Sequence, residues 1–286
     1  MKKIDNNRAL SFDEYKKIID NAIETKSLHK LRLDENYFDT CGNYWIVDKY
    51  ISCCGQIDEN ATPNTLSAYQ KAIDNNYVIT IPVQMLDDES IVCFAHQNLS
   101  KIIPNTSGYI KTLQLSDLKQ LNLNEKEEKI PTLEESLEFI ANRTQVIIEI
   151  LNDGMIEKFE SKVLAIIQNY IAKYDCYNNI AIMSINPFTL EYFYKNYPYI
   201  TRILKSGNFK EKLYGSIKTR KLKKLKYYKI TQADFIAYSH ELLPNSIVEK
   251  YKPVGIIAYT LNNQNQYIKL AGHCDNIIFK NFTPTI

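Results

Sequence analysis

Residues 51–83, "ISCCGQIDENATPNTLSAYQKAIDNNYVITIPV", decide the fold of this chain. The stretch begins with a short apolar run and continues through a polar loop into a helical pattern over "NTLSAYQKAIDN". It ends in a second run rich in β-branched residues. A strand, a helix and a second strand in this order predict a βαβ unit with two parallel strands. No GxGxxG turn follows the first strand, so the unit gives no support to a nucleotide-binding fold.

The same alternation continues along the chain. Further β-branched or apolar runs lie near residues 145–150, 179–184, 201–205, 233–238, 254–260 and 275–280. Most gaps between them are long enough for a helix. Eight strands alternating with helices predict a parallel sheet, and at 286 residues the expected solution is a closed (β/α)8 barrel. A doubly wound open sheet is the alternative.

One connection departs from this pattern. "YVITIPVQML" is followed by "DDES" and then by "IVCFAH", and four residues are far too few for a crossover helix. We therefore predict a β-hairpin that leaves the barrel after its second strand and returns. Its register would bring His96 beside Thr80 and Pro82, since directly opposed residues lie about 5 Å apart.

Composition sets limits on the class of protein. Hydrophobic residues make up 45% of the chain and charged residues 24%, which allows a sizeable core, and the net charge of +2 selects no class of partner. No window approaches 18 apolar residues, so we expect no transmembrane segment. The start of the chain shows no apolar export signal, and the six cysteines have no metal-type spacing. We therefore expect reduced thiols and a cytoplasmic protein.

The N-terminal region differs from the rest. Residues 11–26 repeat apolar positions at helical spacing after the cap candidate Ser11. We predict a helical extension over residues 1–45 and a barrel domain over residues 46–286.

Barrel enzymes carry their chemistry at the carboxyl ends of the strands. The predicted site residues are Cys53, Cys54, Thr80, Pro82, His96, Glu149, Ser184, Lys205, Tyr238 and Tyr259, with His240 as a further candidate. This mixture suits a polyol or a phosphorylated small molecule. Alternatively, the same side chains simply fill the end of the barrel.

Several short segments follow one another in a recognisable order. They are Cys53-Cys54-Gly55, Thr62-Pro63-Asn64-Thr65, Thr80-Ile81-Pro82, His96-Gln97 and Glu149-Ile150-Leu151, followed by "MSINPFTLEYF", "AYTLNN" and "CDNIIFKNFTP". In order and spacing this series resembles the glycerophosphodiester phosphodiesterase family, from about residue 50 to residue 286.

The resemblance implies a hydrolase of lipid metabolism in which three carboxylates hold Ca²⁺ or Mg²⁺, two histidines act as acid and base, and an arginine grips the phosphate. A hard divalent cation takes several oxygen ligands and stabilises charge on phosphoryl oxygens. Of the seven matching positions, this chain keeps only His96 and Glu149. The replaced positions carry Cys53 for histidine, Cys54 for arginine, Leu151 for lysine, and Thr80 and Pro82 for two carboxylates.

These departures lead us to expect that catalysis is lost or strongly impaired and that no metal cofactor is bound. Proline in a central parallel strand removes a ladder hydrogen bond, so Pro82 argues further against a tuned ion site. Without its metal, Glu149 would pair with Lys205 or His96. The barrel would then bind a phosphorylated polyol or a headgroup-like ligand, or serve in regulation, through Cys54, Lys205, Tyr238 and Tyr259.

The alternative from another class is an active phosphodiesterase with a rebuilt site. It would hydrolyse glycerophosphodiesters to glycerol phosphate and an alcohol, with Ca²⁺ or Mg²⁺ at Glu149 and with His96 as acid or base. Cys53 could then act as base or nucleophile, if His96 lowered its pKa. Otherwise Cys53 and Cys54 are small buried apolar residues.

A second alternative is a peripheral scaffold that uses residues 210–229, "KEKLYGSIKTRKLKKLKYYK". This segment has nine basic residues and one acid, and its apolar positions Leu213, Ile217, Leu222 and Leu225 are spaced to pack one face on the barrel. Such a run is either a solvated helix face or a contact for an anionic membrane or an acidic partner. No nucleic-acid-binding motif accompanies the charge, so we expect no nucleic acid.

Overall fold

The protein is described here in a computed structural model. The structure describes residues 45–57, 61–103, 106–123, 127–208, 216–251, 254–270 and 272–285, and for residues 216–218 only the backbone. The predicted extension over residues 1–45 therefore lies outside the described residues except for Trp45.

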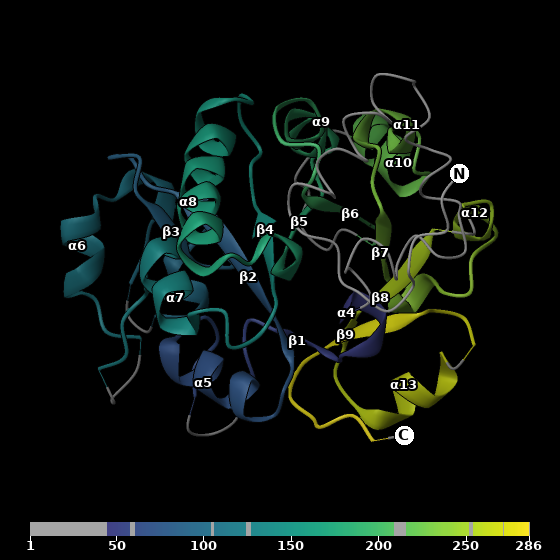
Figure 1. Ribbon diagram of the computed structural model, residues 1–286, viewed down its shortest axis with the longest axis horizontal. Coiled ribbons are helices and arrows are strands. Elements are labelled where there is room, and N and C mark those ends of the chain that lie inside the picture. The colour runs from purple at the N-terminus through teal and green to yellow at the C-terminus, as the bar shows by residue number, and fades with distance from the viewer. Residues whose placement is uncertain are drawn as a thin grey trace.

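Eight parallel strands close into a barrel (Figure 1). They are β1 (Ile51–Cys53), β2 (Val78–Met85), β4 (Val146–Ile150), β5 (Ile180–Ser184), β6 (Thr201–Ser206), β7 (Phe235–Ser239), β8 (Gly255–Leu261) and β9 (Asn276–Phe279). Each strand pairs with its neighbours in the ring, and the pairing of β1 with β2 and with β9 closes it. The predicted (β/α)8 barrel is confirmed, and the open sheet is wrong.

Helices surround the outer face of the barrel (Figure 1). The α-helices are α4 (Trp45–Asp48), α5 (Leu66–Asp74), α6 (Leu115–Gln120), α7 (Leu133–Ile140), α8 (Lys158–Tyr174), α9 (Pro187–Asn196), α10 (Ser216–Lys223), α11 (Tyr228–Thr231), α12 (Ser246–Glu249) and α13 (Gln264–Lys269). Short 3-10 turns are η1 (Leu99–Lys101), η2 (Ile110–Thr112), η3 (Tyr177–Asn179) and η4 (His240–Leu242). Local capping fixes several helix starts. At α7, Thr132 accepts a hydrogen bond from the Glu135 N–H, and the Glu135 side chain accepts one from the Thr132 N–H.

The hairpin after β2 is present. Strand β3 (Ile91–Cys93) runs antiparallel to β2, with Val83 opposite Cys93, and this is the predicted register. The ladder ends at Cys93, before it reaches His96. The Gln84 side-chain amide instead donates to the carbonyl oxygens of Phe94 at 2.9 Å and His96 at 2.7 Å. The backbone of His96 is thus held by a side chain, and the predicted sheet pairing of His96 with Thr80 is wrong.

Pro82 lies in β2 at the point where the pairing on one side of the strand changes from β1 to β3. The Val78 N–H donates toward β1, to the Tyr50 carbonyl, and the Ile79 N–H donates toward β4, to the Gln145 carbonyl. Because N–H directions alternate along a strand, the nitrogen of residue 82 faces the β1 side. The pairing with β1 ends at Thr80. Beyond Thr80 the partner on this side is β3, whose ladder with β2 ends at the Val83–Cys93 pair, just before Pro82. The parallel pairing with β4 continues through Pro82, which lies opposite Glu149. The missing N–H of Pro82 thus coincides with the end of the hairpin ladder and leaves the pairing with β4 intact.

The barrel interior is closed at the end where the strands begin. Trp45 and Ile46 of α4 pack into the apolar cluster that fills the interior, together with residues such as Ile147. The Trp45 indole N–H donates to the Asn178 carbonyl at 2.6 Å, and the Asn276 amide donates to the Ile46 carbonyl at 2.5 Å. Trp45 thus packs as part of the barrel, and the opposite end remains for a site.

Gly55 marks the tight turn after β1. Its φ is +82°, and a Cβ at this position would lie 2.7 Å from the Ala68 carbonyl carbon of α5. The turn therefore requires glycine for both its backbone angle and its close approach to the helix.

We predict that Gly55→Ala destabilises the protein more than Gly108→Ala does. Gly108 has a φ of +107° but no atom within 4 Å of a Cβ, so it loses only the backbone term of about 1–2 kcal/mol. Gly55 adds overpacking of about 1–3 kcal/mol. Urea unfolding of both variants measures the difference. Equal losses would show that the α5 contact relaxes without cost.

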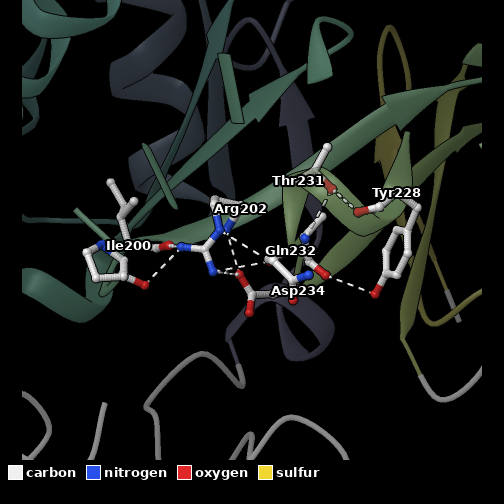
Figure 2. A network of polar contacts seen from close by, with 8 residues as sticks. Ile200, Arg202, Tyr228, Thr231, Gln232 and Asp234 are labelled. Atoms are coloured by element: carbon white, nitrogen blue, oxygen red, sulfur yellow. Dashed lines mark hydrogen bonds and ion pairs between the residues drawn. The ribbon is translucent and has the colours of Figure 1, made fainter. Parts of the chain in front are cut away.

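A buried ion pair lies outside the barrel near the start of β6 (Figure 2). The Arg202 guanidinium lies 3.3 Å from the Asp234 carboxylate, and their side chains are only 1% and 3% exposed. The guanidinium also donates to the carbonyl oxygens of Pro198, Ile200 and Gln232. The Asp234 carboxylate accepts the Arg202 backbone N–H at 2.9 Å. This network joins the beginnings of β6 and β7.

Candidate functional site

A cavity of about 450 Å³ opens at the carboxyl ends of the strands. Its walls come from the segment after β3 and from the ends of β4, β5, β6, β7 and β8. Glu149, Lys205 and Tyr259, which the sequence predicted at this end, all line it. His96, Ser184 and His240 line it as well.

An ion pair between Glu149 and Lys205 lies in the wall of this cavity. The Lys205 Nζ is 2.5 Å from the Glu149 Oε1, and the two side chains are 17% and 9% exposed. The same Nζ lies 4.7 Å from the centre of the Tyr259 ring, within reach of a cation–π contact. Burial by itself lowers the pKa of Lys205, but the negative charge of Glu149 outweighs it and raises that pKa above its ordinary value. Lys205 is therefore a stable cation, and the predicted pairing of Glu149 is confirmed.

The residues at this site do not fit the divalent metal of the resemblance. Thr80 uses its hydroxyl to accept from the Cys54 N–H at 3.1 Å and to donate to the Ser52 carbonyl at 3.3 Å. Pro82 offers no side-chain oxygen, and the Glu149 Oε1 is held by an ammonium. Within the described ranges, no three histidine, cysteine, aspartate or glutamate side chains are grouped to hold a metal ion. We derive no step through a metal.

Two histidines line the cavity. The His96 ring packs edge-on against Phe94, with centroids 6.3 Å apart. The His240 Nδ1 lies 3.2 Å from the Tyr259 carbonyl oxygen, which fixes the ring at the rim beside Lys205 and Glu149. The predicted role of His96 as acid or base is not tested by this arrangement and stays a prediction.

Cys53 is the last residue of β1 and Cys54 follows it, and neither lines the cavity. Their sulfur atoms are 3.6 Å apart, with Cys53 half-buried against the barrel interior and Cys54 buried. A hydrogen bond from the Cys54 thiol lowers the pKa of Cys53 to about 7, and the charge of Lys205 acts in the same direction against the effect of burial. The pKa of Cys54 is raised by the same contact and by burial.

We predict that Cys53 is alkylated at a lower pH than the isolated thiol of Cys274. The thiolate is the nucleophile, so the rate at Cys53 should rise through about pH 7, whereas burial raises the pKa of Cys274 to about 11. Peptide mapping after timed iodoacetamide treatment between pH 6 and 9 measures both rates. A rate at Cys53 that is still rising steeply at pH 9 would contradict the lowered pKa.

The sequence predicted Tyr238 among the site residues, but the structure places its side chain elsewhere. In β7, Phe235 and Ala237 face the barrel interior, whereas Tyr238 packs in the cluster between the sheet and the helices. Its hydroxyl donates to the Lys223 carbonyl at 3.0 Å. It therefore does not line the cavity, because strand alternation places it on the outer face. Cys54 is also buried and does not line the cavity. Ser184 lines the cavity, but its hydroxyl donates to the Ile150 carbonyl at 2.9 Å.

Sequence reasoning missed a set of asparagines. Each follows the end of a strand by one or two residues and lines the cavity: Asn152, Asn186, Asn208 and Asn262. Because the carboxyl ends of barrel strands meet at one face, this repeated position was the available signal. The amides give the cavity donors and acceptors without charge.

The basic segment is described from residue 216 onward. Leu222 and Leu225 are buried, as predicted, while Arg220, Lys221, Lys224, Lys226 and Lys229 are exposed. We call these five exposed residues the basic surface. Residues Leu213 and Ile217 lie outside the described side chains. In the part of the chain that the structure describes, none of the helices is long and apolar enough to cross a lipid bilayer.

Comparisons with known proteins agree with this architecture. Residues 57–281 match the model of the glycerophosphoryl diester phosphodiesterase family. YhdW of Bacillus subtilis (strain 168), whose name places it provisionally among the glycerophosphodiester phosphodiesterases, is 26% identical over 220 residues, which are 73% of this chain and 85% of YhdW.

Solved structures show the same fold. An Oleispira antarctica phosphodiesterase in complex with the product sn-glycerol-3-phosphate superposes with a TM-score of 0.65 at 21% identity, over 83% of this chain and 94% of that one. A glycerophosphodiester phosphodiesterase from Thermotoga maritima superposes with a TM-score of 0.60 at 22% identity, over 81% of this chain and 94% of that one.

Proposed function

This chain belongs to the glycerophosphoryl diester phosphodiesterase family, and on that premise we propose that it binds a phosphorylated polyol without the divalent metal that the family chemistry implies. Catalysis by that chemistry is lost or strongly impaired in this proposal. The barrel is kept for binding or regulation.

The Glu149–Lys205 ion pair carries the proposal. An ammonium has three donors, and one of them is directed at Glu149. The others remain to meet a phosphate, because Lys205 lies on the cavity wall. Lys205, which is held in position by Glu149, would therefore supply the positive charge that neutralises a phosphate. In the family chemistry a divalent metal has this role. The relative from Oleispira antarctica holds sn-glycerol-3-phosphate, which makes glycerol 3-phosphate the first ligand to test.

The asparagines suit the other half of such a ligand. Hydroxyl groups need partners that both donate and accept, and amides provide both. The Asn186 amide is oriented by its hydrogen bond to the Asn152 backbone carbonyl at 3.1 Å. The Asn152 amide donates to the Met155 carbonyl at 3.1 Å and to the Glu160 carboxylate at 2.8 Å, so Asn152 would offer a ligand its side-chain oxygen. The cavity is thus lined by one fixed cation, Lys205, and by uncharged polar side chains.

Titration calorimetry with sn-glycerol 3-phosphate tests the proposal. We expect binding in the presence of a metal chelator, no gain from added Ca²⁺ or Mg²⁺, and much weaker binding of glycerol. At a ligand concentration of 100 times Kd, the protein should gain about 2.7 kcal/mol of stability. Metal-dependent stabilisation, or hydrolysis of a chromogenic phosphodiester that His96→Ala abolishes, would instead support the active phosphodiesterase.

The basic surface supports a second role as a peripheral membrane contact. Lys223 connects this surface to the cavity, because it lies on the same helix α10 as Arg220 and Lys221 and its Nζ is 3.5 Å from the Oδ1 of Asn208, a cavity residue. Beside it, Phe188 is 38% exposed and its ring lies 5.9 Å from that of Tyr227. Basic and aromatic side chains together suit an anionic bilayer better than an acidic protein or nucleic acid.

Vesicle flotation tests the membrane role. Phosphatidylserine-containing vesicles should bind the protein, with weaker binding at high salt and in Lys221→Glu/Lys224→Glu. The control Lys111→Glu/Lys269→Glu reverses two exposed lysines elsewhere and should bind like the wild type. Salt-insensitive binding, or equal loss in both double variants, would contradict it.

The cytoplasmic location stays a prediction. All five cysteines that the structure describes are free thiols.

A further inference from the structure

Cys53 and Cys54 are adjacent in sequence, and their sulfur atoms face each other. The Sγ–Sγ distance is 3.6 Å. Cys54 has a left-handed φ of +64°, and its N–H is held by the Thr80 carbonyl oxygen and hydroxyl, each at 3.1 Å. The Cys54 carbonyl accepts the Asn64 N–H at 2.9 Å. Both peptide groups of the turn are thus anchored, so the two thiols are held in position by the backbone.

The sulfur separation is wrong for a relaxed disulfide. A disulfide bond is about 2.05 Å long and joins residues whose Cα atoms usually lie about 4.4–6.8 Å apart. Neighbouring Cα atoms across a trans peptide are only about 3.8 Å apart. A Cys53–Cys54 disulfide would therefore be strained and easily reduced.

The distance between the two sulfur atoms is suitable for both of them to bond to one polarisable atom. Two thiolates bonded at about 2.3 Å to one pyramidal atom, with an angle of about 95–100° between the two bonds, lie about 3.4–3.5 Å apart. The observed separation of 3.6 Å is close to this spacing, so a small rotation of the two side chains completes it without movement of the backbone. No cluster of three ligand-type side chains surrounds it in the described part of the chain, so the centre that fits is one that needs only two protein ligands.

We propose that Cys53 and Cys54 form a bidentate site for a single thiophilic atom of the trivalent arsenic class. Arsenite, As(OH)₃, reacts with two thiols to give HO–As(S-Cys)₂ and two molecules of water. Two As–S bonds form and two As–O bonds break. Both thiol protons leave in the water, and no oxidation state changes.

The surroundings favour the first step of this reaction. Cys53 is the half-buried member, and it contacts the barrel interior cluster that also includes Tyr259. The nearby positive charge of Lys205 stabilises its thiolate, which is the attacking form. Cys54 then closes the ring from 3.6 Å away. The captured atom would lie at the carboxyl end of β1, beneath the cavity wall.

Arsenite capture by the reduced full-length protein, followed by intact mass and thiol titration, tests the proposal. We expect one arsenic per protein, the loss of two titratable thiols, and reversal by 2,3-dimercaptopropanol but not by an equal concentration of thiol groups as 2-mercaptoethanol. Cys53→Ser and Cys54→Ser should each bind arsenite about 10²–10⁴-fold more weakly, because the second bond becomes intermolecular. Cys274→Ser, a control on a lone half-buried cysteine, should bind like the wild type.

Three results would overturn the site. They are wild-type protein that takes up no arsenic, an adduct that a monothiol removes as readily as a dithiol, or an adduct that survives in both serine variants. The dithiol reversal needs only the wild-type chain, so the test stands even if a serine variant fails to fold.

Discussion

Replacing Asp234 with alanine lowers the free energy of unfolding by about 3–5 kcal/mol, the range for breaking one partner of a buried ion pair. The variant leaves the Arg202 guanidinium buried, because its side chain is only 1% exposed. The guanidinium keeps its bonds to the carbonyl oxygens of Ile200 and Gln232, but these carry no full negative charge. The loss is therefore dominated by the removal of the carboxylate from beside this buried cation.

Urea unfolding followed by circular dichroism measures this loss. The control is Glu138→Ala, which breaks an ion pair to Lys173 whose side chains are 61% and 54% exposed. Such a surface pair contributes about 0–1 kcal/mol, so the control should unfold close to the wild type. Equal midpoints for Asp234→Ala and Glu138→Ala would show that Arg202 finds water or another partner.

A double variant separates the charge from the packing. Arg202→Met with Asp234→Leu removes both charges and keeps apolar volume, and buried pairs replaced in this way are often neutral in stability. We expect the double variant to recover most of the loss. A double variant as unstable as Asp234→Ala would place the stability in the carbonyl contacts of the guanidinium instead.

The barrel could be predicted because its signals are local. A strand such as β4 is a continuous apolar run, buried on both faces of the sheet, and the gaps between such runs set the helices. The hairpin was readable because four residues cannot cross a sheet. No local sequence signal predicts that the sheet closes into a ring. That prediction rests only on the number of strands and the length of the chain.

The site is predictable only in part, because a position near the end of a strand does not by itself decide on which face of the sheet the side chain lies. Glu149, Lys205 and Tyr259 occupy inward positions near strand ends, and they line the cavity. Tyr238 also lies near the end of β7, but on the outer face of the sheet. The effect of Pro82 depended on where the pairing of β2 changes from β1 to β3, which no property of Pro82 itself reveals.

The Arg202–Asp234 pair shows what the sequence could not supply. Arginine within "TRILKS" reads as one polar residue in a strand, with nothing to name its partner 32 residues later. The pair forms because β6 and β7 are neighbours in the ring, with Ile203 opposite Phe235. Ion pairs between residues far apart in the sequence depend on which strands are neighbours in the barrel. The position of a strand, by contrast, can be predicted from its own residues.

Lys205→Met should weaken binding of sn-glycerol 3-phosphate by about 10- to 100-fold. A hydrogen bond to a charged group contributes about 1.5–3 kcal/mol, and methionine keeps the apolar stem while it removes the cation. The Glu149 carboxylate would also lose its partner at 2.5 Å and would repel the phosphate. Calorimetry in a metal chelator measures the affinity, with the exposed Lys269→Met as the control.

The same variant distinguishes a binding role of Lys205 from a structural one. Lys205→Met leaves Glu149 largely buried without its partner, which should lower stability by about 1–3 kcal/mol. Adding Glu149→Gln removes that unpaired charge, so Lys205→Met/Glu149→Gln should regain stability while its binding stays weak. If binding instead recovers together with stability, Lys205 acts only by holding the barrel mouth in shape. Binding that is unchanged in Lys205→Met would remove the ammonium from the proposed phosphate site altogether.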